Sequence, residues 1–274
     1  MNFTKTHIKI LNTTIYCEHR LQDKPTIFLI HGFVASSYTF NRLKVLLANN
    51  FSVIAIDLPG FGKSEKSTSF TYSFDNYASL VLECMDHFQK KEAYVAGHSM
   101  GGQIALYTAM KKPDRVKKLI LFCSSGYLPK AKNYLIFSSY LPFFQLIARR
   151  KINSQSVVRN LRNVFYDHSF ITDDQIEEYG RPLQDKNFPR SLVRLLRHRE
   201  GDLTSEQLKE IKTPTLLLWG EEDKVVPLPI GRKLAKDLPY AKLISYEKAG
   251  HLLTEEKAQQ VYKEILSFTE PRIK

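Results

Sequence analysis

Cysteine pairs and long apolar runs are two features that this chain lacks. Its three cysteines, Cys17, Cys84 and Cys123, are odd in number and far apart, and none belongs to a C-x-x-C pair. This pattern argues against a disulfide framework and favours reduced thiols, with Cys123 buried in an apolar run. The first residues form no apolar segment of the signal-peptide kind, and no window reaches the ~18 unbroken apolar residues of a membrane span. We therefore expect a soluble, cytoplasmic protein without a membrane span.

Acidic residues are also in short supply. The 40 Lys and Arg stand against 28 Asp and Glu, which gives a net charge of +12. The basic residues are spread over the chain in short pairs such as Lys111-Lys112 and Lys117-Lys118. No run of aromatic residues alternates with arginine as in a nucleic-acid platform. We expect a basic, solvated surface and no nucleic-acid partner.

What the chain does contain is an alternation of short apolar runs with helix-length segments, over a length that suits one large domain or a domain with an insertion. The strand-like runs are Ile8–Leu11, Thr14–Cys17, Thr26–Ile30, Ser52–Ile56, Ala93–Ala96, Lys118–Phe122, Thr215–Trp219 and Lys242–Ser245. The helical segments are Tyr38–Leu47, Phe74–Phe88, Gln103–Met110, Pro229–Leu238 and Glu255–Phe268. This alternation predicts an α/β fold with a mostly parallel central sheet covered by helices on both faces. Asn12-Thr13 joins the first two runs and predicts an antiparallel edge hairpin.

The alternation stops between about Gly126 and Lys212, where no convincing strand pattern is present. This interval is rich in aromatic residues and arginine, and its patterns are helical: Leu141–Arg150, Ser154–Asn163, Asp173–Gly180 and Ser191–Arg199. Function is often carried by loops and insertions on a rigid scaffold. We predict a core domain of residues 1–126 and 211–274, with a helical cap of residues 127–210 inserted over the carboxyl edge of the sheet.

A G-x-S-x-G motif at residues 97–101 lies between a strand pattern and a helix pattern. A serine in a strained strand-to-helix turn needs small neighbours, because a side chain at Gly97 or Gly101 would crowd the backbone. Such a turn lifts Ser99 Oγ clear of the sheet and places it at a helix N-terminus, which favours developing negative charge. The motif therefore predicts Ser99 as a nucleophile.

A serine hydroxyl is a weak nucleophile and needs a base that is held by a third group. Asp223 and His251 each follow a strand pattern, on loops where open α/β sheets build their sites. The order Ser, Asp, His is the one expected along such a chain. We predict that His251 takes the Ser99 proton and that Asp223 fixes the imidazole tautomer. Glu222, in the same loop, remains an alternative to Asp223.

Attack on an ester carbonyl creates an oxyanion that backbone N–H groups must stabilise. We predict one donor at Met100, which follows the nucleophile, and another at Phe33, in the loop after a strand pattern. Gly32 lets this loop bend back. His31 is expected to hydrogen-bond the backbone of its own loop rather than to act as a base.

In these residues the chain resembles the α/β-hydrolase superfamily. The matching motifs are His31-Gly32-Phe33, Asp57-Leu58-Pro59-Gly60-Phe61-Gly62-Lys63-Ser64, the elbow around Ser99, Gly220 with Asp223, Val226-Pro227 and Gly250-His251. The resemblance implies a serine hydrolase that needs no metal and no organic cofactor. We assign the run after Asp57 to a shaped turn without chemistry. Its end imitates a phosphate-binding loop, but Asp57 stands where that loop requires glycine.

The residue types at the site narrow the chemistry that this resemblance implies. Haloalkane dehalogenases and epoxide hydrolases use aspartate where this chain has Ser99, so both are disfavoured. Hydrolases of carbon–carbon bonds in ring-fission products usually have a tryptophan after the histidine, where this chain has Leu252. Arg181 or Arg190 of the cap is nevertheless available to bind their acidic substrates.

The remaining activity is cleavage of a carboxylic ester or thioester with a small to medium hydrophobic acyl group, through an acyl-enzyme. Two alternatives stay open. One is a carbon–carbon hydrolase of the 2-hydroxy-6-oxo-dienoate type, and the other is a catalytically slow small-molecule receptor or signalling partner.

Four residues are predicted to contact the substrate: Leu252, Tyr127, Phe137 and Phe144. The segment Tyr134–Phe144 is apolar almost all round. It either forms the acyl pocket, with an entry lip that makes weak contact with lipid interfaces, or it is the core of the cap itself. The expected partner is a small-molecule acyl substrate, and the oligomeric state is left open.

Overall fold

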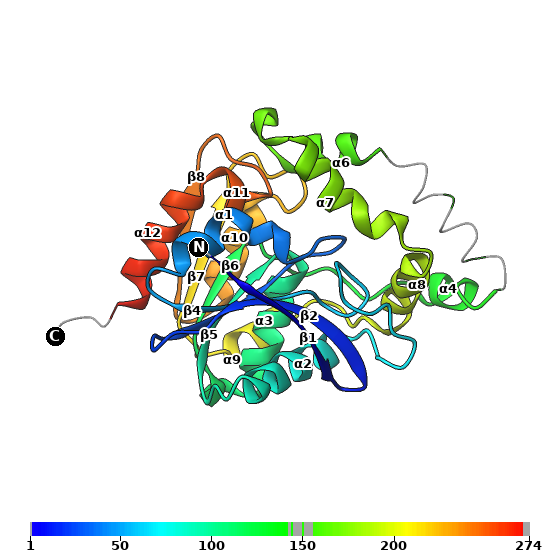
Figure 1. Ribbon diagram of the computed structural model, residues 1–274, viewed down its shortest axis with the longest axis horizontal. Helices are drawn as coiled ribbons and strands as arrows, with labels where there is room; N and C mark the ends of the chain where they lie inside the picture. The colour runs from blue at the N-terminus through cyan, green and yellow to red at the C-terminus, as the bar shows by residue number, and fades with distance from the viewer. Residues whose placement is uncertain (1, 142–143, 145–149, 151–155, 271–274) are drawn as a thin grey trace.

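The computed structural model describes residues 2–141, 144, 150 and 156–270. Its centre is an eight-stranded sheet of order β1-β2-β4-β3-β5-β6-β7-β8 (Figure 1). The strands are β1 (Thr4–Ile10), β2 (Thr13–Arg20), β3 (Thr26–Ile30), β4 (Ser52–Ile56), β5 (Ala93–His98), β6 (Val116–Phe122), β7 (Thr215–Gly220) and β8 (Ala241–Tyr246). β2 pairs antiparallel with β1 and β4, and all other pairs are parallel. The eight predicted runs are therefore confirmed as strands.

The edge hairpin turns one residue earlier than predicted. Leu11 and Asn12 form the turn with φ values of 48° and 58°, and Ile10 pairs with Thr13. Two consecutive positive φ values give the twist that a two-residue hairpin requires. The prediction that Asn12-Thr13 is the link is wrong by one residue, because Thr13 already pairs within β2.

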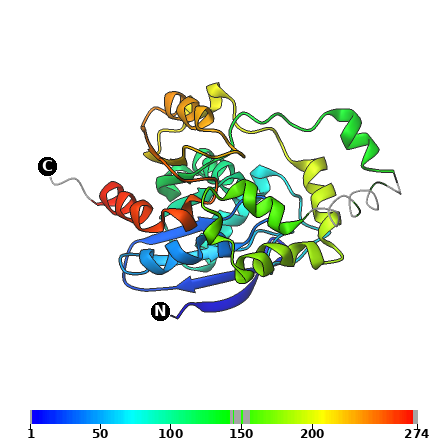
Figure 2. The same cartoon turned by 90° about the horizontal axis from the view of Figure 1, so that it is seen from above.

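Helices cover both faces of the sheet (Figure 2). The core helices are α1 (Asn41–Leu47), α2 (Phe74–His87), α3 (Met100–Lys111), α9 (Ser205–Glu210), α10 (Leu228–Asp237), α11 (Leu253–Glu256) and α12 (Ala258–Thr269). α1 contacts α11 and α12, whereas α2 contacts α3 and α10 contacts α9. β3, β4, β5 and β7 are buried at every position, because a sheet covered on both faces keeps neither side in water. The predicted fold class is confirmed.

Between β6 and β7 the described residues form helices and no strand. They are α4 (Asn133–Ser138), α6 (Val157–Val164), α7 (Asp173–Gln184) and α8 (Phe188–His198), followed by α9. α9 lies inside the predicted cap interval but contacts α10 of the core. The predicted helix Leu141–Arg150 lies largely outside the described residues. No helix in the described part of the chain is long and apolar enough to cross a membrane.

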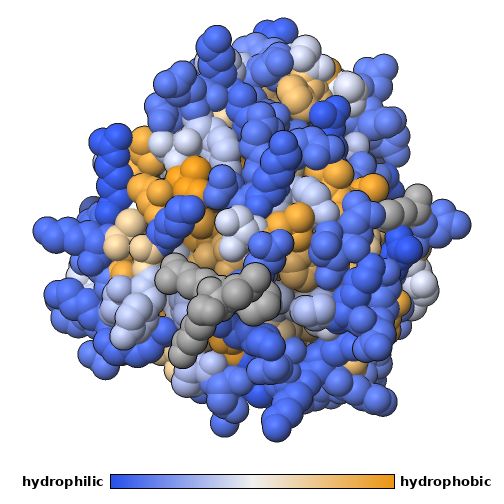
Figure 3. Space-filling view, turned by 90° about the vertical axis from the view of Figure 1, so that its left-hand side faces the viewer, coloured by the Kyte–Doolittle hydropathy of each residue, from blue (hydrophilic) through white to orange (hydrophobic). Residues whose placement is uncertain are grey.

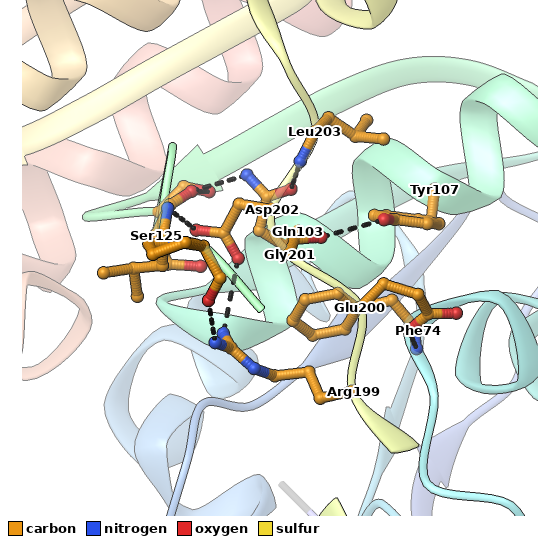
Figure 4. Close-up of polar contacts among 12 residues, drawn as sticks. Phe74, Gln103, Tyr107, Ser125, Arg199, Glu200, Gly201, Asp202 and Leu203 are labelled. Carbon is orange, nitrogen blue, oxygen red and sulfur yellow. Dashed lines mark hydrogen bonds and ion pairs between the residues drawn. The ribbon is translucent and has the colours of Figure 1, made fainter. Parts of the chain in front are cut away.

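The segment that follows α8 returns to the core along α3 (Figure 4). Tyr107 Oη donates to Gly201 O at 3.0 Å, and Gln103 Oε1 accepts from the Leu203 N–H at 3.1 Å. Gln103 Nε2 also donates to Ser125 O at 2.7 Å. The helix that begins after the predicted nucleophile therefore holds both the segment that leaves β6 and the segment that returns from α8.

A buried carboxyl lies where α7 meets the core. Glu255 on α11 is only 2% exposed, and its Oε2 lies 3.7 Å from Arg42 Nε on α1. Gln175 Nε2 on α7 donates to the same oxygen at 3.5 Å. Burial raises the pKa of Glu255 to about 7, because the charged form loses its hydration.

We predict that Glu255→Gln flattens the pH dependence of stability. The folded state binds the Glu255 proton more tightly than the unfolded state does. The protonated carboxyl therefore contributes its whole stabilising free energy below the ordinary pKa of 4.5, and this stabilisation is lost as the pH rises through about 7. The free energy of unfolding should fall by about 2–3 kcal/mol between pH 5 and 8 through this group. Denaturant titrations of wild type, Glu255→Gln and the surface control Glu264→Gln measure it. An equal fall in all three proteins contradicts the prediction.

Candidate active site

Ser99 lies in the turn between β5 and α3 with a strained backbone, at φ 53° and ψ −119°. A Cβ at Gly97 would lie 2.2 Å from Gly101 O, and a Cβ at Gly101 would lie 2.1 Å from Ile30 O. The predicted crowding at both glycines is confirmed, because only glycine permits this approach. Ser99 itself is half-buried, and its N–H donates to Phe122 O at 3.0 Å.

His251 and Asp223 are in direct contact. His251 Nδ1 lies 2.7 Å from Asp223 Oδ2, and both side chains are almost fully buried. Asp223 Oδ1 accepts from the N–H groups of Val225 at 2.8 Å and Val226 at 2.9 Å. Burial favours the neutral carboxyl, but His251 and these backbone donors outweigh it and lower the pKa of Asp223. A carboxylate therefore accepts the Nδ1 proton, which leaves His251 Nε2 free to act as a base.

Two neighbouring carboxylates brace other parts of the same loops. Glu222 Oε2 accepts from the Ala249 N–H at 3.0 Å, and Glu221 Oε1 accepts from the Ser245 hydroxyl at 2.6 Å. These contacts hold the chain before His251. The geometry therefore favours Asp223 over the alternative Glu222 as the partner of the histidine.

The loop after β3 passes directly beside Ser99. A Cβ at Gly32 would lie 3.0 Å from Ser99 Cβ, so a larger residue would press on the nucleophile. Phe33 follows in this loop, and Met100 is the first residue of α3. Within the described part of the chain, neither of their backbone N–H groups has a hydrogen-bond acceptor. Both are available as the predicted oxyanion donors.

His31 and Asp57 hold the loops around the site. His31 Nδ1 donates to Gly32 O at 2.7 Å, and its Nε2 accepts from the Leu58 N–H at 2.9 Å. Burial lowers the pKa of His31, so the ring is neutral and joins two loops. Asp57 accepts from two backbone N–H groups, both at 2.7 Å. These contacts agree with a structural role for His31 and with a shaped turn at Asp57.

A cavity of about 750 Å³ opens over Ser99 and His251. Its core wall comes from residues 32–35, His98, Val225 and Leu252. Its other wall comes from α6, α7 and α8, within the predicted cap, with the side chains Val157, Asn160, Leu161, Asn163, Val164, Tyr179, Leu183, Phe188 and Leu192. Most of this lining is apolar, and no Asp, Glu, Lys or Arg is among the described residues that form it. The cavity suits an uncharged, apolar group beside the nucleophile.

Among the four predicted substrate contacts, Leu252 alone is a described residue of this cavity. Tyr127 donates instead to Asp237 Oδ2 on α10 at 2.7 Å. Phe137 is 76% exposed on α4, and Phe144 is half-buried away from the described lining. The described cavity wall comes from the later helices instead, so substrate contact by these three aromatic residues stays a prediction.

His98, the variable position of the motif, contacts the loop that carries the base. Its Nε2 donates to His251 O at 2.8 Å. Burial and the neighbouring His251 lower the pKa of His98 to about 3, so the ring stays neutral. The sequence offered no signal for the contact between His98 and His251, since the G-x-S-x-G motif allows any residue at position 98.

Glu256 on α11 joins the loop of His251 to the turn after α6. Its Oε2 accepts from the Gly250 N–H at 2.7 Å. Its Oε1 accepts from the N–H groups of Tyr166 at 2.8 Å and Asp167 at 2.9 Å, in the turn after α6. One carboxylate therefore joins two segments that are far apart in the sequence.

The end of α6 also contacts His251, the predicted base, directly. The His251 N–H donates to Val164 O at 2.8 Å, and a Cβ at Gly250 would lie 2.6 Å from the same oxygen. Val164 lines the cavity as well. The position of the base therefore depends on the turn after α6. Sequence reasoning missed this dependence because the contact is made by a backbone carbonyl, which leaves no residue-type signature.

Among the described residues, Cys123, Asp223 and His251 place three potential metal-ligand atoms within 4.8 Å of one another. The Asp223 carboxylate and the His251 ring are already hydrogen-bonded to each other. Burial raises the pKa of Cys123 well above its ordinary value, whereas metal ligation needs a thiolate. This donor set is unfavourable to a metal ion, and independence from metals and cofactors stays a prediction.

Residues 25–258 match the family model of the α/β hydrolase fold. The chain belongs to the α/β-hydrolase family. It is 43% identical over 255 residues to the uncharacterized hydrolase YugF of Bacillus subtilis strain 168, which covers 93% of each chain. It is 30% identical over 235 residues to a 2-hydroxy-6-oxo-6-phenylhexa-2,4-dienoate hydrolase of Burkholderia cepacia, or 84% of this chain and 80% of the relative.

A solved structure of a membrane phospholipase A, described as a bacterial virulence factor, has the same fold. Its TM-score is 0.81 at 26% identity, over 97% of this chain and 86% of that one. The predicted superfamily is confirmed, and the protein is a hydrolase by family.

We predict that Asp223→Asn slows the reaction of Ser99 with a fluorophosphonate by about 10³–10⁴-fold, because an amide favours the wrong imidazole tautomer. Glu222→Gln, in the same loop, should lose no more than about tenfold, because it disturbs the backbone before His251 without changing the imidazole tautomer. Labelling rates with a fluorescent probe provide the measurement. A slow Glu222→Gln beside a normal Asp223→Asn would show that Glu222 is the acid.

Glu256→Gln should also slow this labelling, by about tenfold to a hundredfold. The amide keeps the size of the side chain but turns an NH₂ group toward backbone donors, which displaces the loop of the base. Glu264→Gln on the surface of α12 is the control. A loss of thermal stability with an unchanged labelling rate would mean that Glu256 supports the fold without positioning the base.

Proposed function

We propose that this protein is a serine hydrolase that cleaves an uncharged carboxylic ester or thioester with a small to medium hydrophobic acyl group. The observation that supports it is the cavity over Ser99 and His251, whose described lining is largely apolar and carries no charge. Such a wall accommodates hydrocarbon. It disfavours an unpaired carboxylate, because burial of a lone charge is costly.

In this proposal, the residues of the site divide the reaction into two halves. Ser99 Oγ attacks the acyl carbonyl while His251 Nε2 takes the hydroxyl proton, and Asp223 stabilises the imidazolium. The N–H groups of Phe33 and Met100 stabilise the oxyanion. His251 then protonates the departing alcohol or thiol. In the second half, His251 activates a water that hydrolyses the acyl-enzyme and regenerates Ser99.

Carbon–carbon bond hydrolysis is the second candidate, supported by the similarity to the dienoate hydrolase of Burkholderia cepacia. Its substrate is a carboxylate by name and would be expected to meet a cationic side chain. Arg181 pairs instead with Glu177 at 3.3 Å and Glu178 at 2.5 Å along α7. Arg190 lies in a separate groove beside Lys66. The described lining therefore favours the uncharged ester.

The proposed location is the cytoplasm. The three cysteines are free and buried in the structure. Free thiols persist in a reducing compartment, which supports this location.

The test is hydrolysis of p-nitrophenyl esters from acetate to laurate, with Ser99→Ala alongside. We expect turnover with an optimum in acyl length, and Ser99→Ala should lose at least ~10³-fold of it. Wild type should hydrolyse 2-hydroxy-6-oxo-6-phenylhexa-2,4-dienoate more slowly than the best ester. Faster turnover of the dienoate would establish the second candidate. No turnover of either substrate by a protein whose Ser99 still reacts with a fluorophosphonate would favour a receptor.

A further inference from the structure

The net charge of the chain is concentrated in one stretch. Residues 115–166 contain ten Lys and Arg and no Asp or Glu. Outside this stretch, 30 basic residues stand against 28 acidic ones, so the remainder is almost neutral. The basic residues are spread along the whole chain, and it is the gap in acidic residues that creates the excess.

The same stretch exposes apolar side chains. Of the fourteen large apolar residues that are exposed in the described part of the chain, six lie within residues 128–141: Leu128, Tyr134, Leu135, Phe137, Tyr140 and Leu141. Together with Lys130 and Lys132 we call them the α4 patch. α4 lies at the end of the molecule opposite α12 in both views (Figures 1 and 2). A concentration of exposed apolar residues marks an interaction surface.

Specific contacts hold this patch in place. Arg197 on α8 donates through Nε to Ser139 Oγ at 2.8 Å, and its guanidinium lies 3.9 Å from the centre of the Tyr140 ring. At the other end, Asp202 Oδ2 accepts from the Leu128 N–H at 3.1 Å, in the return segment of Figure 4. The patch is therefore presented outward by a defined scaffold.

The charge of the patch is not neutralised by the protein. Lys130 and Lys132 are exposed, and no carboxylate of the described residues pairs with either. Earlier in the acid-free stretch, by contrast, Arg115 pairs with Asp86 at 2.5 Å and Lys117 pairs with Glu92 at 2.9 Å. The patch combines aromatic rings, leucines and ammonium groups without a carboxylate in ion-pair contact. Glu200, Asp202 and Glu206 line the groove beside Leu128 and Lys130, at one end of the patch.

We propose that the α4 patch docks on a bilayer surface that contains anionic lipids. Aromatic side chains settle at the boundary between headgroups and acyl chains, leucines enter it, and lysines bind lipid phosphates. A second copy of the chain is a poorer occupant, because the lysines of two such patches would face each other and repel. A nucleic acid would pair with the lysines but would leave the leucines without an apolar partner. The proposal does not depend on the ester chemistry at Ser99.

The opposite end of the molecule supplies matched controls. Figure 3 faces the α12 end and shows mostly hydrophilic side chains, with apolar groups in small separate areas. Tyr240, which precedes β8, is 62% exposed and so matches Tyr134, which is 64% exposed. Lys236 on α10 and Lys263 on α12 are exposed like Lys130 and Lys132.

The experiment is sedimentation of the full-length protein with vesicles of phosphatidylcholine, with and without 30% phosphatidylglycerol. Wild type should sediment only with the anionic vesicles, and less as salt rises. Lys130→Gln/Lys132→Gln should lower the partition coefficient about 30-fold, because each lysine close to an anionic surface contributes roughly the same favourable binding free energy and the variant loses two of them. Tyr134→Ala should lower it about fivefold. Tyr240→Ala and Lys236→Gln/Lys263→Gln should bind like wild type, and all variants should keep the wild-type labelling of Ser99.

Three results would overturn the proposal. The first is no sedimentation with anionic vesicles at low salt. The second is equal binding by the patch variants and their controls, which would mean that overall charge alone attracts the protein. The third is a concentration-dependent dimer that light scattering detects in wild type and not in Tyr134→Ala, which would assign the patch to a second copy.

Discussion

The backbone of Ser99 is held in a conformation that L-residues rarely adopt, and most of the site is arranged around that constraint. Gly97 and Gly101 let β5, α3 and the end of β3 approach within contact distance of one another. The same approach brings the β3 loop beside the nucleophile and leaves the N–H groups of Phe33 and Met100 available. Strain of this kind persists only where the surrounding structure over-determines it, and here three buried elements do so.

His251, the predicted base, is placed by a different set of contacts, in which the segment between β6 and β7 takes part. His251 is bonded to Asp223 through its ring, but its backbone is held by Val164 and His98. Glu256 joins the same loop to the turn after α6. The helices between β6 and β7 therefore form a wall of the cavity, and the turn after α6 also holds the loop of His251. A substitution near Val164 that alters the cavity is expected to shift His251 as well, because Val164 both lines the cavity and accepts the His251 N–H.

Apolar residues of the cap have two separate uses. Those on α6, α7 and α8 face the nucleophile and form the cavity. Those on α4 face outward, beside lysines that no described carboxylate neutralises. An apolar ester, the proposed substrate, is sparingly soluble and partitions into bilayers, so the apolar cavity and the proposed lipid docking of the α4 patch are compatible in one protein.

The sequence by itself determined the elements of the sheet and the residues at the centre of the candidate site. The spacing of apolar residues and the glycine or turn residues between them are local properties of the sequence. All eight strands, the strand-to-helix turn at Ser99 and the loops of Asp223 and His251 could therefore be recognised from it. Only the tertiary structure decided which carboxylate meets His251. Glu222 and Asp223 are neighbours in one loop, and the fold directs the side chain of Asp223 toward the histidine and that of Glu222 toward the Ala249 N–H. It also decided which aromatic residues face the nucleophile. The sequence could not place Tyr127, Phe137 and Phe144, because an apolar side chain has the same sequence signature whether it lines a cavity, packs on a helix or faces a partner. Contacts between segments far apart in the chain make that choice, and no local pattern encodes them.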